Sequence, residues 1–219
     1  MSSLSPVARE GWPFILGFAV VAALASLVLP NLACILPFWL LTGWCVWFFR
    51  DPDRVVPADP GVLVAPADGR LVAVEEVAQA PFGLGPSLKL SIFMNVFSVH
   101  VNRAPMAGRI EAMAYHPGRF LNARLDKSSL ENERMELLMR GEGGILVCFV
   151  QVAGLVARRI VCRVGQGDRL ERGGRFGLIR FGSRVDLYVP RSAKVLVTLG
   201  DETRAGETIM AHLNVAAGG

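Results

Sequence analysis

Apolar residues are distributed very unevenly along this chain. An uncharged run extends from Gly11 to Phe49, and Pro30-Asn31 divides it into two apolar segments. Each segment has about 18 residues, near the ~20 that a helix needs to cross a bilayer. A cleavable signal peptide fits less well, because a second apolar segment follows the first. The pattern therefore predicts a membrane-anchoring helical hairpin over residues 1–50, with a hairpin buried in a soluble core as the alternative.

Aromatic and basic residues gather at the open end of this hairpin. They are Trp12, Trp44, Trp47, Arg9, Arg50 and Arg54. Tryptophan favours the membrane interface, and basic residues favour the cytoplasmic side of a membrane. We therefore expect the hairpin to lie in the cell membrane and the rest of the chain to lie on its cytoplasmic side.

The pattern changes after the hairpin. Prolines exclude a long helix over residues 51–61 and predict an extended linker. From residue 62 to residue 219, short segments rich in Val and Ile are separated by Gly, Pro or Asp, as strands are separated by turns. The expected strands cover residues 71–77, 88–94, 108–115, 133–139, 145–154, 157–164 and 193–199. The predicted fold is mainly β (α+β), an antiparallel β-sandwich-like domain behind an N-terminal apolar helical hairpin.

One turn pattern occurs twice. Gly167-Asp168 is followed by Gly173, and Gly200-Asp201 is followed by Gly206. Such G-D-x4-G turns recur in biotinyl- and lipoyl-like β-sandwich modules, so a membrane-tethered adaptor without catalysis is the alternative function. That alternative lacks its central residue, because no lysine lies at a hairpin tip of the required kind.

Charge and cysteine content narrow the possible partners. Of the 23 basic residues 20 are arginines, and arginine forms bidentate pairs with phosphate, which suits a phospholipid head group. There is no long basic run with interleaved aromatic residues, so nucleic acid is not an expected partner. Cys34, Cys45, Cys148 and Cys162 lack the spacing of a metal site. We expect reduced thiols and no metal.

Two residues have the chemistry of a proton-transfer pair. His100 ends the apolar run in VFSVHVNRAP, and a histidine side chain exchanges protons near neutral pH. Asp68 lies in the turn APADG, and an aspartate can orient and charge an imidazole. Each residue also has a structural interpretation, since a histidine at a strand end is commonly structural and aspartate commonly caps such a turn. The residues alone leave both interpretations open.

Gly182-Ser183 is the only Gly-Ser dipeptide in the chain. Glycine adopts strained torsions and has no side chain to obstruct its carbonyl, so the Ser183 hydroxyl could attack the Gly182 carbonyl in an N-to-O acyl shift. β-Elimination would then break the chain and leave dehydroalanine, which hydrolyses to a pyruvoyl group. Any serine has these atoms, so an ordinary turn into a strand is the alternative.

Read in order, several segments resemble the phosphatidylserine decarboxylase family in its short, membrane-anchored form. They are FFRDPDR, APADG, VFSVHVNRAPMAG, YHPG, ENER, QVAGLVARRIV and GLIRFGSRVDLYVP, followed by a terminal VxxGDxxxxGE. The resemblance covers nearly everything from Phe48 to Ile209. It implies a precursor that cleaves itself between Gly182 and Ser183. The β chain would keep residues 1–182, and the α chain would hold residues 183–219 and pair with it as a heterodimer.

The resemblance also implies the chemistry. Ser183 would become a covalent pyruvoyl cofactor, with no metal and no pyridoxal phosphate. This group would form a Schiff base with phosphatidylserine and release CO2 to give phosphatidylethanolamine in phospholipid biosynthesis. His100 and Asp68 match the positions associated with maturation and catalysis.

One position departs from the family pattern. Longer bacterial members carry a second histidine three residues after the first, and this chain has Arg103 there. The sequence leaves open whether His100 alone serves both self-cleavage and decarboxylation. His116 is a possible substitute only if the fold brings it close.

Three arginines lie nearest in sequence to these segments. Arg103, Arg180 and Arg184 are therefore candidates for binding the lipid phosphate, although most arginines lie on solvated surface. A pyruvoyl decarboxylase for a soluble amino acid is a rival interpretation. It shares the cofactor but gives no reason for the membrane anchor.

Overall fold

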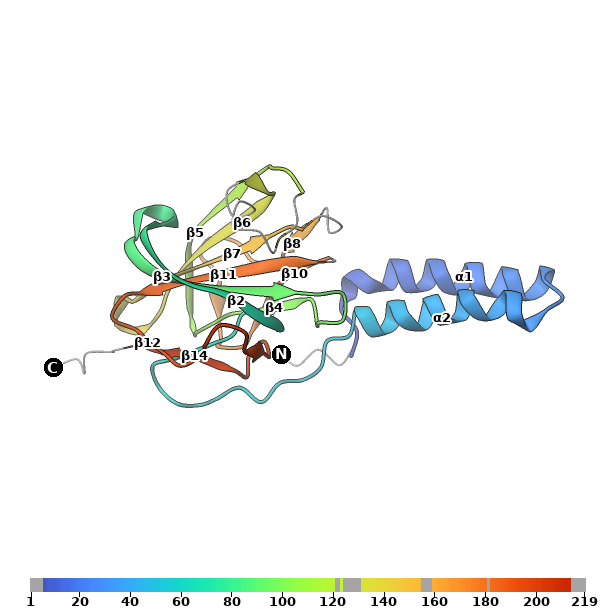
Figure 1. Cartoon of the computed structure of the whole chain (residues 1–219), viewed down its shortest axis with the longest axis horizontal. Helices are drawn as coiled ribbons and strands as arrows, with labels where there is room; N and C mark the ends of the chain where they lie inside the picture. The colour runs from blue at the N-terminus through green and yellow to red at the C-terminus, as the bar shows by residue number, and fades with distance from the viewer. Residues whose placement is uncertain (1–5, 121–122, 124–130, 155–158, 181, 214–219) are drawn as a thin grey trace. The chain divides into compact units, whose positions relative to one another are not determined.

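The chain forms two compact units, Met1–Asp53 and Arg54–Gly219 (Figure 1). The first is helical, and the second consists mainly of strands. The computed structural model describes residues 6–120, 123, 131–154, 159–180 and 182–213.

The first unit is the helical hairpin that the apolar pattern predicts. A 3-10 turn (Arg9–Gly11) leads into α1 (Trp12–Val28), and α2 (Leu32–Phe48) packs beside α1. The two helices are separated at Pro30-Asn31, as predicted. Asn31 caps α2 because its Oδ1 accepts a hydrogen bond of 2.9 Å from a backbone N–H in the first turn.

The composition of the hairpin suits a membrane. Arg9–Val28 is long and apolar enough to cross a bilayer, with a mean hydropathy of 2.1, whereas α2 is apolar but shorter. Large apolar side chains on both helices are exposed, among them Leu27 and Leu32. By length and composition the first helix is a candidate membrane span.

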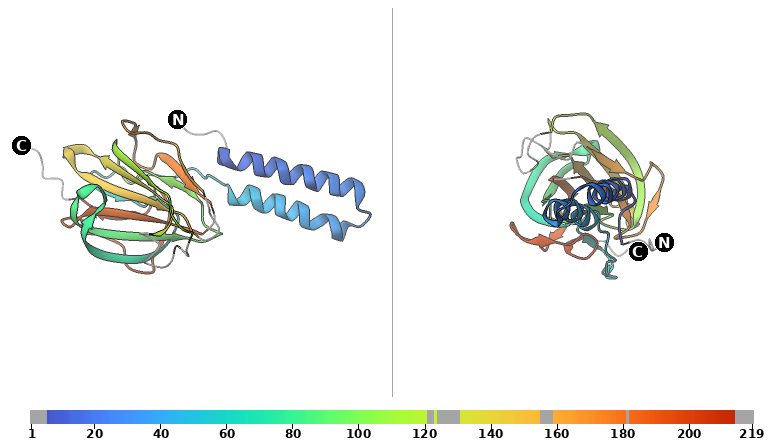
Figure 2. Two further views of the ribbon diagram at one scale, coloured as in Figure 1. Left: turned by 90° about the horizontal axis from the view of Figure 1, so that it is seen from above. Right: turned by 90° about the vertical axis from the view of Figure 1, so that its right-hand side faces the viewer.

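The second unit contains three antiparallel sheets (Figure 2). Eight strands form a curled sheet in the order β13-β2-β3-β11-β7-β6-β5-β9, and two smaller sheets have the orders β1-β14-β12 and β4-β10-β8. The strands are β1 (Val62–Val64), β2 (Gly69–Ala80), β3 (Gly85–Met94), β4 (Val101–Arg103), β5 (Gly108–His116), β6 (Arg134–Arg140), β7 (Leu146–Val152), β8 (Ile160–Cys162), β9 (Arg169–Leu170), β10 (Arg175–Ile179), β11 (Ser183–Pro190), β12 (Lys194–Val195), β13 (Glu202–Thr203) and β14 (Ile209–His212). Two further 3-10 turns are Pro81–Gly83 and Glu142–Gly144. The predicted fold class is confirmed.

The predicted strands match observed ones, but their lengths differ. The longest predictions overlap β2, β3, β5, β6 and β7 closely. The segment at 157–164, whose first two residues lie outside the described ones, contains only the short β8, and 193–199 contains only β12. The strand predictions missed seven observed strands, namely β1, β4, β9, β10, β11, β13 and β14. All of these except β11 have at most 5 residues, which is too short for an apolar alternation to stand out.

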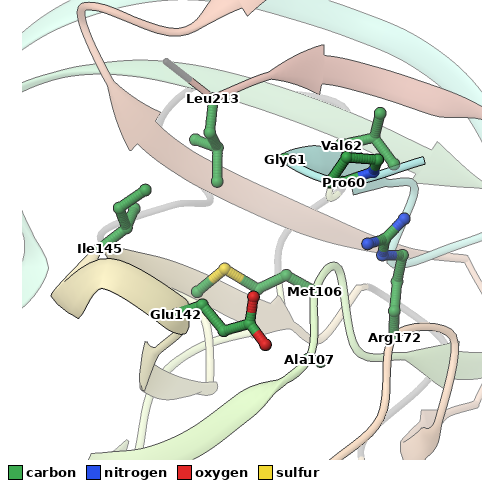
Figure 3. A pocket seen from close by; sticks show the side chains of 9 residues that line it. All are labelled: Pro60, Gly61, Val62, Met106, Ala107, Glu142, Ile145, Arg172 and Leu213. Carbon is green, nitrogen blue, oxygen red and sulfur yellow. The ribbon is translucent and has the colours of Figure 1, made fainter. Parts of the chain in front are cut away.

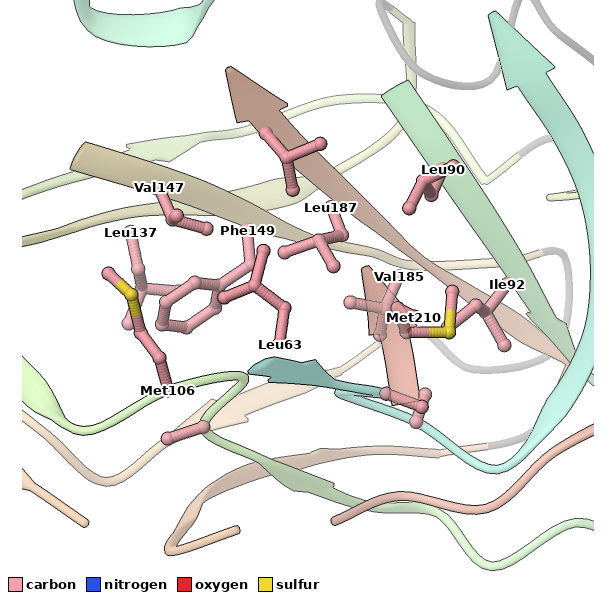
Figure 4. Close-up of a cluster of buried hydrophobic side chains, with 14 of the residues drawn as sticks. Leu63, Leu90, Ile92, Met106, Leu137, Val147, Phe149, Val185, Leu187 and Met210 are labelled. Carbon is pink, nitrogen blue, oxygen red and sulfur yellow. The ribbon is translucent and has the colours of Figure 1, made fainter. Parts of the chain in front are cut away.

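β11 lies in the middle of the eight-stranded sheet, between β3 and β7. Its core-facing side chains, Val185 and Leu187, pack among apolar residues of the neighbouring strands (Figure 4). The rings of Phe149 on β7 and Phe176 on β10 lie 4.8 Å apart, centroid to centroid, so this core joins the large sheet to a smaller one. The strand that follows Gly182 is therefore enclosed on both edges and packed against the core.

The second unit contains two copies of one structural plan. In the first copy a turn APADG at 65–69 joins β1 to β2, and in the second a turn APMAG at 104–108 joins β4 to β5. The two turns lie against each other. The Val64 N–H donates to a carbonyl of the second turn at 2.8 Å, and the Arg103 N–H donates to a carbonyl of the first at 2.9 Å.

The two G-D-x4-G turns complete these copies. Asp168 and Asp201 each accept a hydrogen bond of 2.8 Å from the backbone N–H three residues earlier. An arginine, Arg109 or Arg70, donates its Nε–H to the first glycine carbonyl of each turn at 3.0 Å. The turns bring β9 beside β5 and β13 beside β2. The repeated motif is thus explained by the duplicated fold and needs no adaptor function.

A buried ion pair lies on β11. Arg184 Nε lies 2.7 Å from Asp186 Oδ1, and both side chains are 1% exposed. Arg184 also donates Nη1–H to the Ala123 carbonyl at 2.9 Å. Burial, followed by the nearby carboxylates, raises the pKa of Cys148 and of Tyr188, so both stay neutral beside this pair.

Replacing Asp186 with alanine should lower the free energy of unfolding by about 3–5 kcal/mol, because the Arg184 charge then stays buried without its partner. The matched control is Glu111→Ala, which removes the partner of Arg140 from an exposed pair and should cost about 0–1 kcal/mol. Chemical denaturation of the purified chain in detergent measures both losses. Similar losses for the two variants would contradict the prediction.

Candidate active site

Ser183 is the first residue of β11, and its side chain is fully buried. It lies opposite Met94 on β3, while the next residue, Arg184, lies opposite Val152 on β7. Within the described residues its Oγ has no hydrogen-bond partner. An unpaired buried hydroxyl costs free energy, so its presence here requires an explanation.

The residue before it, Gly182, has a left-handed backbone with a φ of 63°. A Cβ at Gly182 would meet no atom within 4 Å, so the torsion and not crowding favours glycine. The Gly182 carbonyl oxygen lies directly against Gly154, where an added Cβ would overlap it. The peptide bond between Gly182 and Ser183 therefore has a fixed neighbour on the side of β7.

A buried amide holds the backbone of that neighbour. Asn132 is fully buried and donates Nδ2–H to the Ala153 carbonyl at 2.7 Å. The Ala153 N–H donates to the Glu133 carbonyl at 2.9 Å. Both polar groups of Ala153 are thus engaged, and the peptide that leads to Gly154 is held in place behind the Gly182 carbonyl.

His100 precedes β4 and is fully buried. Its backbone carbonyl accepts from the Ile179 N–H at 3.3 Å, which ties it to β10, the strand before Gly182. Its Nδ1 lies 2.9 Å from the Ser98 carbonyl. A carbonyl only accepts, so Nδ1 carries the proton in the neutral ring, and Nε2 is the nitrogen that can take up another.

A buried polar chain connects the strands around this site. Asn102 on β4 donates Nδ2–H to the Met94 sulfur at 3.5 Å and accepts at Oδ1 from Gln151 Nε2 at 2.8 Å. Met94 is the residue opposite Ser183. The chain therefore fixes β3, β4 and β7 relative to one another at the end of the sheet where Ser183 lies.

Asp68 faces an arginine. Arg54 Nη2 lies 2.8 and 3.0 Å from its two carboxylate oxygens, and the Ala205 N–H donates to Oδ1 at 2.7 Å. Glu207 lies on the other side of this guanidinium, at 3.5 Å. The hydrogen bonds of the Asp68 carboxylate go to Arg54 and Ala205, so within the described residues it does not have the predicted bond to an imidazole.

A comparison of the two copies of the turn shows that the turn does not require an aspartate at residue 68. Ala107 stands at the corresponding position of the second turn, which forms without a carboxylate. Capping the turn therefore does not by itself account for Asp68. Its ion pair with Arg54 distinguishes the first copy from the second.

The three candidate arginines are placed differently. Arg184 is buried in its ion pair, so a lipid phosphate could reach it only if that pair opened. Arg103 is 5% exposed and donates Nη1–H to the Gly173 carbonyl at 3.2 Å. Arg180 lies two residues before Gly182 and is partly exposed. Of the three, Arg180 is the most accessible.

His116 does not substitute for a second histidine near Ser183. It pairs with Arg134, which pairs with Val152, which pairs with Arg184. Three strand spacings, ~14 Å, therefore separate its backbone from β11. Its Nε2 lies 3.3 Å from Glu136 Oε2.

A separate cavity of about 460 Å³ opens at the other end of the sheet (Figure 3). Ile145, which lines it, precedes β7, whereas the start of β11 lies beside the opposite end of β7. Arg172 at its edge donates to the Pro57 and Asp59 carbonyls. This cavity is not part of the site around Ser183.

The described residues include no cluster of His, Cys, Asp or Glu that could hold a metal ion. The four cysteines are free thiols. Burial raises the pKa of Cys162, which disfavours the thiolate form that binds metals.

Sequence reasoning assigned no role to Asn132 or Gly154 and placed Arg54 only among the basic residues that flank the hairpin. All three lie in segments that carry the resemblance, namely ENER, QVAG and FFRDPDR. The identity of a glycine or an asparagine does not by itself indicate a role at a reacting site. The role of such a residue becomes visible only when its neighbours in space are known.

Comparisons with known proteins agree with the resemblance. The family model for phosphatidylserine decarboxylase matches residues 41–211. A phosphatidylserine decarboxylase proenzyme of Magnetococcus marinus is 54% identical over 94% of this chain and 95% of its own length. Proenzymes of the same name from Nitrosomonas europaea and Cupriavidus metallidurans are 54% and 49% identical over at least 95% of both chains.

The match by the family model spans most of the chain and includes both Gly182 and Ser183, and the relatives align along nearly their whole length. These matches do not support the adaptor alternative. The chain belongs to the phosphatidylserine decarboxylase family.

Proposed function

We propose that this chain is a proenzyme that cleaves itself between Gly182 and Ser183 and then decarboxylates phosphatidylserine to phosphatidylethanolamine. The observation that carries the proposal is the geometry of this one peptide bond. The Ser183 hydroxyl is buried and has no partner within the described residues, and the Gly182 carbonyl next to it is held against Gly154. The names of the aligned relatives support both the substrate and the precursor state.

The self-cleavage uses only atoms of this chain, a base and water. The Ser183 hydroxyl gives its proton to a base and attacks the Gly182 carbonyl carbon. The C–N bond breaks, an ester forms at the Ser183 oxygen, and the Ser183 nitrogen becomes an amine. Loss of the Ser183 Cα proton expels the Gly182 carboxylate and leaves dehydroalanine. This tautomerises, and one water converts it to the pyruvoyl group with release of ammonia.

The surroundings of Ser183 fit such a group. Residue 183 is buried at the very start of β11, so cleavage before it interrupts no strand. A pyruvoyl group supplies a ketone that condenses with the substrate amine and takes up the electron pair released with CO2. The residues around it exclude water and hold the strand end in place.

The two chains would stay together after cleavage. β11 pairs with β3 along eight residues and with β7 along five. β13 and β14, which also belong to residues 183–219, pair with β2 and β1. These ladders and the shared core hold the α chain without a covalent bond, so a heterodimer is the expected product.

His100 is the proposed proton donor to the carbon that loses CO2, because its Nε2 is the nitrogen available to carry that proton. Asp68 is proposed as a positioning residue for maturation. Its pair with Arg54 holds the turn whose Pro66 carbonyl accepts from the Arg103 N–H. That bond fixes β4, the strand that His100 precedes.

The apolar hairpin would keep the enzyme at the membrane that contains its substrate, with the strand-rich unit on the cytoplasmic side as the flanking arginines suggest. Arg180, the most accessible candidate, would bind the lipid phosphate. The rival interpretation, in which the substrate is a soluble amino acid, does not explain why the chain has an apolar hairpin.

Ser183→Ala should abolish cleavage and activity, because alanine has no oxygen to attack the Gly182 carbonyl. The matched control is Ser91→Ala, which removes another buried hydroxyl without a partner in the described residues, on the adjacent strand β3. A denaturing gel should show one chain for the first variant and two for the second. A fully active, uncleaved Ser183→Ala protein would refute the proposed function.

His100→Gln should lower kcat per mole of cleaved chain by about 10²- to 10⁴-fold, the usual contribution of general acid catalysis. His116→Gln is the control, because His116 lies three strands from β11. CO2 release from phosphatidylserine, normalised to the amount of α chain, measures the effect. Activity within twofold of the parent would contradict the assignment, and a failure of cleavage would place His100 in maturation.

Gly154→Ala should slow self-cleavage by about 10²-fold or more, because the methyl group displaces the Gly182 carbonyl from the attacking oxygen. Gly165→Ala is the control, since its Cβ would meet only the Asp168 carboxylate at 3.9 Å. The half-time for appearance of the α chain gives the rate, and thermal unfolding confirms that the variants are folded. Cleavage of folded Gly154→Ala at the parent rate would overturn the positioning role.

A further inference from the structure

A short loop next to Ser183 exposes apolar side chains. It connects β3 to His100 and consists of residues 95–98. Phe97 is 65% exposed and Val96 is 39% exposed. Phe97 is the only exposed phenylalanine of the strand-rich unit within the described residues. Single exposed apolar residues are common, but two adjacent ones beside the reacting bond require an explanation.

The loop is a formed turn. The Asn95 Oδ1 accepts from the Phe97 N–H at 2.8 Å, and the Asn95 carbonyl accepts from the Ser98 N–H at 3.1 Å. These two bonds hold the loop backbone around its apolar tip. The exposure of Phe97 is therefore a consequence of a defined conformation.

The loop also joins the two chemical groups of the site. The residue before it, Met94, lies opposite Ser183 across the β3–β11 ladder. The residue at its end, Ser98, accepts a hydrogen bond from His100 Nδ1 at 2.9 Å. A surface that binds the loop tip would therefore act directly next to both Ser183 and His100.

We propose that residues 95–98 insert Val96 and Phe97 into the membrane surface and so deliver the lipid head group to Ser183. This inference rests on the proposed function, in which the substrate is a membrane phospholipid. Such a lipid keeps its two acyl chains in the bilayer, and only its head group has to reach Ser183. The chain already carries an uncharged segment, Gly11 to Phe49, that places it at a membrane. The partner is therefore a lipid bilayer.

The chemistry of the loop fits that partner better than a protein. Two apolar side chains are far fewer than the ~20 residues that each side of a stable protein interface contributes. Residues 95–103 contain no carboxylate and end in Arg103, so nothing in this segment repels an anionic lipid surface. A shallow apolar tip flanked by polar residues is typical of interfacial insertion.

The test compares membrane-bound and soluble forms of one substrate. Phe97→Asp should lower kcat/KM about tenfold or more on long-chain phosphatidylserine in proteoliposomes that contain the full chain. Its activity on monomeric dihexanoyl phosphatidylserine, and its self-cleavage, should stay within twofold of the parent. Phe97→Leu should retain activity on both substrates. Leu196→Asp is the matched control, an exposed leucine outside the sheet that contains Ser183.

A second measurement does not depend on catalysis. The variant Phe97→Cys is labelled with a fluorophore in proteoliposomes. Cys34 and Cys162 are replaced by serine so that they do not react, and Cys45 and Cys148 are buried. A quencher attached to lipid acyl chains should quench this label and leave a label at residue 196 bright.

The outcomes separate the two proposals. Unchanged vesicle activity, or an equal loss on both substrates, or an unquenched label at residue 97 would overturn the insertion of the loop. A cleaved parent enzyme that releases no CO2 from either substrate would instead overturn the proposed function. In that case the quenching measurement still decides whether the loop enters the membrane.

Discussion

The proposed function depends on how the surrounding sheet holds the peptide bond between Gly182 and Ser183. Gly182 adopts a left-handed torsion and places its carbonyl against Gly154, while Ser183 begins a strand that is paired on both sides. A carbonyl in a flexible turn would be hydrated and free to rotate. Here the surrounding sheet fixes the Gly182 carbonyl and the start of β11 in one buried place, and orientation of this kind would lower the barrier of the proposed self-cleavage.

The duplicated fold explains how the remaining groups reach that place. The turns APADG and APMAG and the two G-D-x4-G turns form a nearly symmetric frame. Symmetry alone would give two equivalent sites. The copies differ at Asp68, whose counterpart is Ala107, and only the first copy has an ion pair with Arg54. Residues that differ between the two copies are therefore the better candidates for function, and residues that both copies share are the better candidates for stability.

Sequence patterns predicted the hairpin, the mainly β fold and most of the long strands, because apolar periodicity reports directly on burial. They made Ser183 and His100 candidate site residues, because the chemistry of a hydroxyl and of an imidazole is intrinsic to the side chain. They did not identify Gly154, Asn132 or the apolar tip at Phe97. These matter through contacts and exposure, which residues distant in sequence create.

By itself, the sequence determined the family, the proposed cleavage dipeptide and the apolar helical hairpin, since each depends on residue identity along the chain. Only the tertiary structure decided that Arg184 is buried in an ion pair, that Asp68 faces Arg54 and that His116 lies three strands away. Strand order and register set these distances. Both result from the packing of the whole sheet, and no local pattern of residues contains them.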